Sequence, residues 1–115
     1  MVDAVDAKMH ALGYALDRMA IELPQVYVRS RSKGDPNDLI LLAGLVGALT
    51  HWFHGMTFMY HPHAWKGTVP KEIMTARILK RLSEEEQSKI EKSPKSLIHN
   101  VYDSCGLGMH HLKRL

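Results

Sequence analysis

The chain has 115 residues, of which 45% are hydrophobic and 23% charged, and its formal net charge is +3. These proportions are typical of one folded domain and exclude a disordered chain. Residues 66–115 carry ten basic and six acidic side chains, a weaker basic bias than a dedicated nucleic-acid binder shows. The single cysteine excludes an internal disulfide and favours a reducing compartment, and the acidic N-terminus does not resemble a secretory signal. We therefore expect a single cytoplasmic domain over 1–115.

The first segment, residues 2–22, has a sustained amphipathic pattern. Its large apolar residues recur alternately three and four positions apart, at Val2, Val5, Met9, Leu12, Leu16, Met19 and Leu23. This is the spacing of a helix that packs on another helix along a narrow seam. The pattern predicts a helix over 2–22 that packs on its own core or on a second chain. We assign Leu12, Leu16 and Met19 to a dimer interface.

The next segment connects this helix to the centre of the chain. Residues 25–28 are predicted to be a short strand or an extended connector, and one such run cannot form a sheet by itself. Residues 29–34 alternate basic and small polar residues, which is typical of a solvated loop. Arginines in such a loop suit the polar rim of a protein interface, so we assign Arg29 and Arg31 to partner binding.

Residues 36–60 form the most apolar part of the chain, and 39–60 contain no Asp, Glu, Lys or Arg. Asp35 suits the N-cap of a helix and Pro36 its first position, whereas Pro62 disfavours a helical conformation in the residue before it. The pattern predicts one long helix over 36–60, buried at the centre of the domain. Its histidines, threonines and glycines, and its flanking charges, argue against a membrane span.

This central helix has two different sides. One side is a stripe of small residues with a histidine, made of Gly44, Ala48, His51 and Gly55. The opposite side is bulky and includes Leu42, Leu45, Leu49 and Trp52. A glycine inside a helix costs up to about 1 kcal/mol relative to alanine, and close approach of another helix can offset that cost. We assign the small stripe to the dimer interface and the leucine side to the core.

Three shorter helices are predicted after the central one. The first covers about 70–82, and the second starts at a capping box of Ser83 and Glu86. The third covers 94–105, with Gly106 placed just after its end, where glycine is common. The fold predicted from these segments is all-α, a small bundle of about five helices around 36–60, and dimeric.

The chain has eight histidines, which makes a metal site the first chemistry to consider. His51 and His54 lie on one turn of the central helix, but the carboxylates that accompany histidine in helical metal sites are not near them. We predict no metal and no cofactor, and keep a His-rich metal-binding bundle as an alternative. Cys105 lies on the apolar face of a predicted helix, where cysteine is usually a core residue. No nucleophile turn, phosphate-binding loop or dinucleotide-binding turn is present, so we do not expect an enzyme.

The function predicted from these patterns is regulation by protein–protein binding. Aromatic and arginine side chains dominate protein interfaces, and the predicted partner-binding residues are Trp52, Phe58, Tyr60, Trp65, Arg29 and Arg31. The heptad helix 2–22 and the apolar helix 36–60 resemble those of the small all-helical anti-activators that sequester quorum-sensing transcription regulators. The resemblance implies a homodimer that binds a regulator's ligand-binding domain and blocks its dimerisation or DNA contact. A second alternative is a small DNA-binding protein with a helix-turn-helix over 84–105.

Overall fold

The structure is a computed structural model that describes residues 4, 7–8, 10–11, 17–26 and 34–115. Its contacts divide the chain into two compact units, unit 1 (Met1–His61) and unit 2 (Pro62–Leu115). Helices account for 62% of the described residues and include the five labelled α2 to α6. Two strands form a small parallel sheet. The fold is therefore α/β, and the predicted all-α class is wrong on this point.

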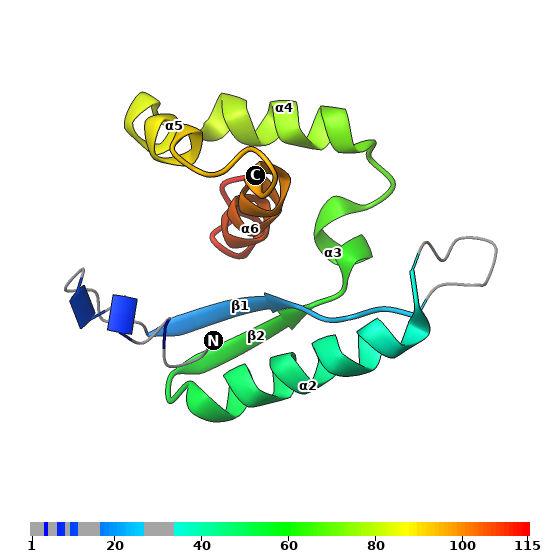
Figure 1. Ribbon diagram of the computed structural model, residues 1–115. Coiled ribbons are helices and arrows are strands. Elements are labelled where there is room, and N and C mark those ends of the chain that lie inside the picture. The colour runs from blue at the N-terminus through cyan, green and yellow to red at the C-terminus, as the bar shows by residue number, and fades with distance from the viewer. Residues whose placement is uncertain (1–3, 5–6, 9, 12–16, 27–33) are drawn as a thin grey trace. The chain divides into compact units, whose positions relative to one another are not determined.

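Unit 1 contains a strand–helix–strand motif, with β1 (Arg18–Glu22), α2 (Pro36–Trp52) and β2 (Met56–Tyr60). The strands are parallel, and their register places Arg18 opposite Met56 and Glu22 opposite Tyr60. Parallel strands cannot be joined by a tight turn and need a long crossover connection. Helix α2 is that crossover, and it runs along the small sheet (Figure 1).

The predicted helix over 2–22 is wrong in its last part. The described residues 4, 7–8 and 10–11 are helical, but 18–22 is strand β1. Met19 therefore lies in the sheet, opposite Thr57, and not on a heptad seam. Methionine, alanine and glutamate favour helices, but the backbone of 18–22 gains a ladder of hydrogen bonds from a segment far along the chain. That non-local pairing outweighs the local preference.

The predicted helix over 36–60 starts as expected and ends early. The Asp35 carboxylate accepts a hydrogen bond from the Asn37 amide at 2.9 Å, which confirms the predicted N-cap. The helix ends at Trp52, and the chain turns through Gly55 into β2. A Cβ on Gly55 would lie 2.5 Å from the carbonyl oxygen of Asp17. A glycine at this position lets the start of β2 approach β1 closely. In the described part of the chain, no helix is long and apolar enough to cross a membrane.

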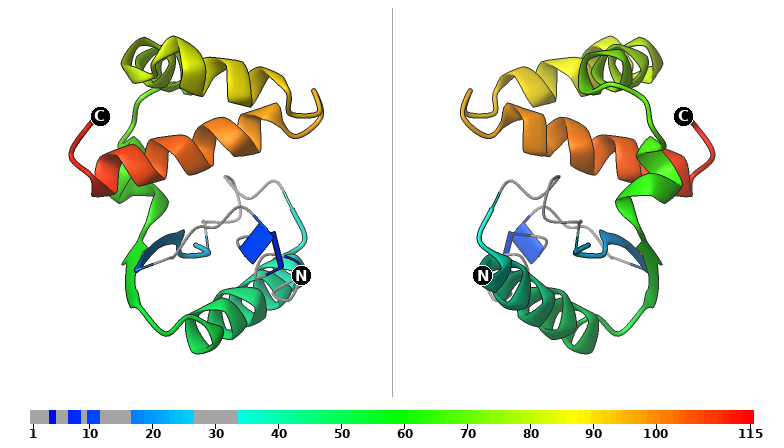
Figure 2. Two further views of the ribbon diagram at one scale, coloured as in Figure 1. Left: turned by 90° about the vertical axis from the view of Figure 1, so that its left-hand side faces the viewer. Right: turned by 90° about the vertical axis from the view of Figure 1, so that its right-hand side faces the viewer.

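Unit 2 is a compact group of four helices, α3 (Pro62–Lys66), α4 (Lys71–Arg81), α5 (Glu84–Glu91) and α6 (Ile98–His111). Helix α6 packs against the other three and lies next to α5 in both views of Figure 2, where α4 is seen nearly end-on. Most fully buried apolar side chains of the described chain are here, namely Trp65, Met74, Ile78, Ile90, Leu107 and Met109. In unit 1 only Val46, among the described residues, is buried to this extent. The core thus surrounds α6, and not α2 as the sequence predicts.

The capping box of α5 is confirmed. The Ser83 hydroxyl accepts from the Glu86 amide at 3.2 Å, and the Glu86 carboxylate accepts from the Ser83 amide at 2.8 Å. The next helix is predicted over 94–105, but α6 begins at Ile98 and continues through Gly106. The assignment of Gly106 to the residue after the helix is wrong. It is buried inside α6, where the side chains of unit 2 leave no room for a Cβ.

Candidate protein interface

Unit 1 exposes large apolar side chains on both its helix and its second strand. On α2, Ile40 is 69% exposed and Leu41 is 74% exposed. On β2, Met56 is 60% exposed and Met59 is 46% exposed. Met56 and Met59 are three positions apart in a strand and so lie on opposite faces of the sheet, whereas Ile40 and Leu41 are neighbours on one helix. Isolated exposed apolar residues are common on proteins, but neighbouring ones mark a surface that binds something.

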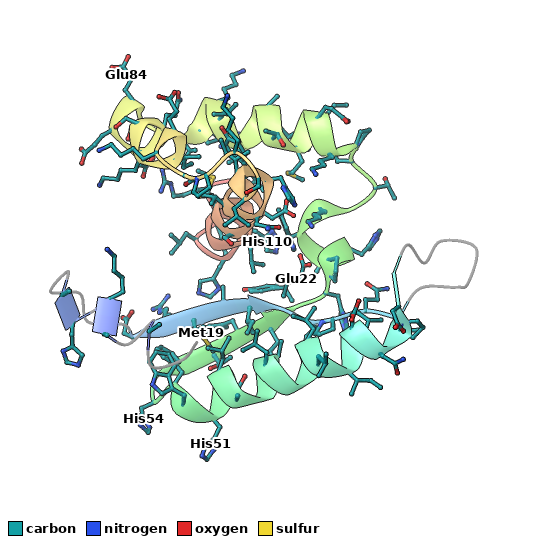
Figure 3. The ribbon with its side chains drawn as sticks, in the orientation of Figure 1. Met19, Glu22, His51, His54, Glu84 and His110 are labelled. Atoms are coloured by element: carbon teal, nitrogen blue, oxygen red, sulfur yellow. The ribbon has the colours of Figure 1, made fainter. Side chains whose placement is uncertain are left out.

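Most exposed residues of α2 lie on the side that faces away from the sheet, but Leu42, on the same side as Val46, is also 46% exposed. Val46 is buried, and Leu39 and Leu49 on the same side are half-buried. With 3.6 residues per turn, the positions opposite Val46 are exposed. We call them the outer face of α2: Ile40, Leu41, Gly44, Gly47, Ala48 and His51. Figure 3 shows His51 pointing away from the strands, whereas Met19 of β1 points towards α2.

The outer face has small residues at its middle and no charged group. A Cβ built on Gly44 or Gly47 would meet nothing within 4 Å. No contact within the described chain therefore uses the space that these glycines leave. This contrasts with Gly55 and Gly106, each of which lies against a close neighbour.

The residues predicted to bind a partner lie in different places. Trp52 ends α2, and Phe58 and Tyr60 belong to β2, and all three are half-buried. The structure places Trp65 in the core of unit 2, where it is only 5% exposed. The partner-binding assignments to Arg29 and Arg31 fall outside the described residues.

The residues predicted for the dimer interface are also separated. Gly44, Ala48 and His51 lie together on the outer face of α2. Gly55 lies beyond the helix in the turn to β2, and Met19 lies in β1. The assignments to Leu12 and Leu16 fall outside the described residues.

Sequence reasoning did not select Ile40 and Leu41, the most exposed large side chains of α2. A signal for Leu41 was present, because it precedes Gly44 by three positions and so extends the same stripe by one turn. The exposure of Met56 and Met59 was not predicted, because the sequence predicts that the helix continues to residue 60. In a helix both would lie near the bulky side, whereas in strand β2 they lie on opposite faces of the sheet.

Several charged groups of unit 2 pair with one another. Arg114 contacts the Glu86 carboxylate with both terminal nitrogens at 3.5 Å. The hydrogen bond from the Ser83 amide, with a smaller effect of Arg114, lowers the pKa of Glu86 below its ordinary value. Lys66 of α3 forms an ion pair with Asp103 of α6 at 3.2 Å. These contacts hold the helices and the C-terminal end of unit 2 together.

The cysteine and the histidines show no reactive cluster. Burial raises the pKa of the Cys105 thiol, and the nearby Glu86 carboxylate adds a smaller increase. A raised pKa keeps a thiol protonated and makes it a poor nucleophile. Across the residues that the structure describes, no group of three or more His, Cys, Asp or Glu side chains is arranged to hold a metal ion. The exposed apolar surface of unit 1 is therefore the strongest candidate for a functional site.

No protein-family model, no curated protein and no solved structure matches this chain.

Proposed function

We propose that this protein acts by binding other proteins through the exposed apolar surface of unit 1. The observation that carries the proposal is the exposure of Ile40 and Leu41, 69% and 74%, on an uncharged helix face. Leaving such side chains in water forgoes about 1.5–3 kcal/mol each relative to full burial. A protein surface that covered them would recover much of that free energy.

The surface has two parts with different character. The outer face of α2 has small residues at its middle. Small residues allow another helix to pack closely against this face. Met56 and Met59 of β2 are long and unbranched, and methionine side chains adapt their shape to different partners. The outer face of α2 therefore suits a close helical contact, and each methionine, on its own face of the sheet, suits an adaptable one.

The partner class that we propose for the exposed apolar surface of unit 1 is a transcription regulator. This step rests on the resemblance of the sequence to small helical anti-activators and on no further observation. Its test is the effect of the purified protein on DNA binding by a regulator that is captured with it. If the captured protein is not a regulator, this step fails while protein binding itself stands.

The proposal is tested by removing exposed apolar side chains and measuring complexes. The first variant combines Ile40→Ser and Leu41→Ser, and the second combines Met56→Ser and Met59→Ser. We expect gel filtration with light scattering to show that the wild-type chain forms complexes, with itself or with captured proteins. Each double variant should lose at least one of these complexes, because its part of the surface can no longer be covered.

Ile73→Ser is the matched control. Ile73 is 48% exposed on α4 of unit 2, so this variant also exchanges an exposed isoleucine for serine, but outside the proposed surface. It should leave all complexes unchanged. Circular dichroism should show the same helix content in every variant. If neither double variant alters any complex, the proposed function is wrong.

A further inference from the structure

We infer that Met56 and Met59 of β2 are sites of reversible oxidation by peroxide, and that oxidation of Met59 loosens the contact between the sheet and α2. The inference starts from a contrast among the methionines that the structure describes. Met56 is 60% exposed and Met59 is 46% exposed. In the core of unit 2, by contrast, Met74 is 6% exposed and Met109 is 4% exposed.

Oxidation of a methionine requires that the peroxide reach its sulfur atom. The sulfur attacks one oxygen of the peroxide, an S–O bond forms, and the O–O bond breaks. The sulfur loses two electrons and the peroxide gains them, so the products of hydrogen peroxide are methionine sulfoxide and one molecule of water. The thiols of a methionine sulfoxide reductase return the sulfoxide to methionine, and a disulfide and water are formed. An exposed sulfur reacts without any opening of the fold, whereas a buried one must wait for local unfolding.

The two exposed methionines lie on opposite faces of the sheet, because they are three positions apart in one strand. The parallel register places Met59 opposite Ile21, and paired residues of neighbouring strands share a face. Ile21 shares its face with Met19, which points towards α2 in Figure 3. Met59 therefore lies on the α2 side of the sheet, and Met56 lies on the other side.

Oxidation should consequently affect the fold at Met59 and not at Met56. The layer between the sheet and α2 contains little fully buried apolar material, since Val46 alone is buried to this extent among the described residues of unit 1. About half of the Met59 side chain is covered. A sulfoxide is polar and disrupts apolar contacts of methionine, and a polar group without a hydrogen-bond partner is costly to cover. The oxidised side chain therefore leaves the layer, and α2 loses part of its contact with the sheet.

The order of oxidation is tested on the full chain with Cys105→Ser, which removes the single thiol. The folded protein is treated with limiting hydrogen peroxide, and mass spectrometry of its peptides locates each added oxygen. We expect Met56 and Met59 to be oxidised before Met74 and Met109. In guanidinium chloride, where all sulfur atoms are exposed, the four should react at similar rates. Oxidation of Met74 or Met109 as early as Met56 in the folded chain would overturn the inference.

The role of Met59 is tested with two matched variants, Met56→Leu and Met59→Leu. Leucine keeps a similar volume and cannot be oxidised, and circular dichroism before treatment shows that both variants fold. The reporter is the Leu23 amide, which donates to the Tyr60 carbonyl beside Met59 at 2.8 Å. Peroxide should speed hydrogen exchange at this amide in Met56→Leu and leave it unchanged in Met59→Leu. Faster exchange in both variants, or in neither, contradicts the role of Met59.

Reversibility is tested by adding a methionine sulfoxide reductase to the oxidised Met56→Leu chain. The exchange rate of the Leu23 amide should return to its value before peroxide treatment. A rate that stays high after the sulfoxide has been reduced would contradict a reversible change at Met59.

The effect of oxidation on binding rests on the proposed function. Peroxide should release any complex that the Met56→Ser and Met59→Ser double variant loses, because a sulfoxide also makes this surface polar. An oxidised chain that keeps such a complex would overturn this effect. If the double variant loses no complex, the part of the proposed function that involves β2 is wrong. The mass spectra and the exchange rates still decide the oxidation of Met56 and Met59 in that case.

Discussion

The indole ring of Trp65 occupies the position into which a side chain at Gly106 would extend. A Cβ on Gly106 would lie 2.5 Å from Cζ3 of Trp65 and 2.8 Å from Cδ1 of Ile78. Helix α6 is thus pressed against α3 and α4 at a residue without a side chain. The glycine costs helix propensity, and the close packing of a large aromatic ring offsets that cost.

We expect Gly106→Ala to destabilise unit 2 by about 1–3 kcal/mol, because the added methyl group must displace Trp65 or Ile78. Gly108→Ala is its control in the same helix. A Cβ on Gly108 meets nothing within 4 Å, so this change should raise stability by up to about 1 kcal/mol. Urea unfolding followed by circular dichroism measures both. Equal effects of the two alanines would contradict this description of the core.

A second glycine sets the close approach of the two strands. Gly55→Ala should weaken the pairing of β1 with β2, because its Cβ would meet the backbone oxygen of Asp17, which cannot rotate away. The amide of Met56 donates to that same oxygen at 3.1 Å. Hydrogen exchange at the Met56 amide should therefore become faster in this variant. Gly47→Ala, measured at the same amide, is the control, and an unchanged exchange rate in Gly55→Ala would refute the prediction.

The capping box at the start of α5 should make stability depend on pH in the acid range. The pKa of Glu86 lies below its ordinary value of 4.5 in the folded state. Its ionised form therefore stabilises the fold fully above pH 4.5, and this contribution is lost as the pH falls through the lower folded pKa. Glu86→Gln should be less stable than wild type at pH 7, and the difference should shrink at pH 3. Glu91→Gln is the control for the loss of one carboxylate in α5. A Glu86→Gln difference of equal size at both pH values would contradict the assignment.

The end of α6 has a lysine in a conformation that favours glycine. Lys113 has a φ of 57°, and the Lys113 and Arg114 amides donate to the carbonyls of His110 and Met109. This is the hydrogen-bond pattern of a helix end that usually carries glycine at this position. Lys113→Gly should raise the free energy of unfolding by about 1 kcal/mol. Lys92→Gly is the control, since Lys92 ends α5 with a right-handed φ of −75°. A loss of stability in Lys113→Gly would count against this geometry.

Cys105 should react slowly with alkylating reagents in the folded protein. Burial raises the pKa of its thiol, and Glu86 raises it further, so little of the reactive thiolate is present at pH 8. Mass spectrometry after iodoacetamide treatment measures the rate, and the same treatment in guanidinium chloride provides the control. Equal rates in the folded and unfolded protein would show that the thiol is not protected.

The outer face of α2 could be predicted in part from the sequence. The small stripe and the leucine side of this helix can be read from its 3.6-residue period, and in the structure the stripe is exposed while Val46 on the other side is buried. The exposure of Ile40 and Leu41 could not be predicted from the sequence. It depends on how much of the helix the sheet and the rest of unit 1 cover, and no local pattern contains that information.

Features that depend on neighbouring residues can be predicted from the sequence. The cap at Asp35 and the capping box of Ser83 and Glu86 rest on hydrogen bonds across two or three positions, so their residue types predict them. Only the tertiary structure decided β1, β2 and the place of Gly106 inside α6. A strand exists because a distant segment completes its hydrogen bonds, and a buried glycine is required because a distant ring fills the space beside it. For the first reason residues 18–22, whose types favour a helix, form a strand. For the second reason Gly106, predicted to follow a helix, lies at a packing contact inside one.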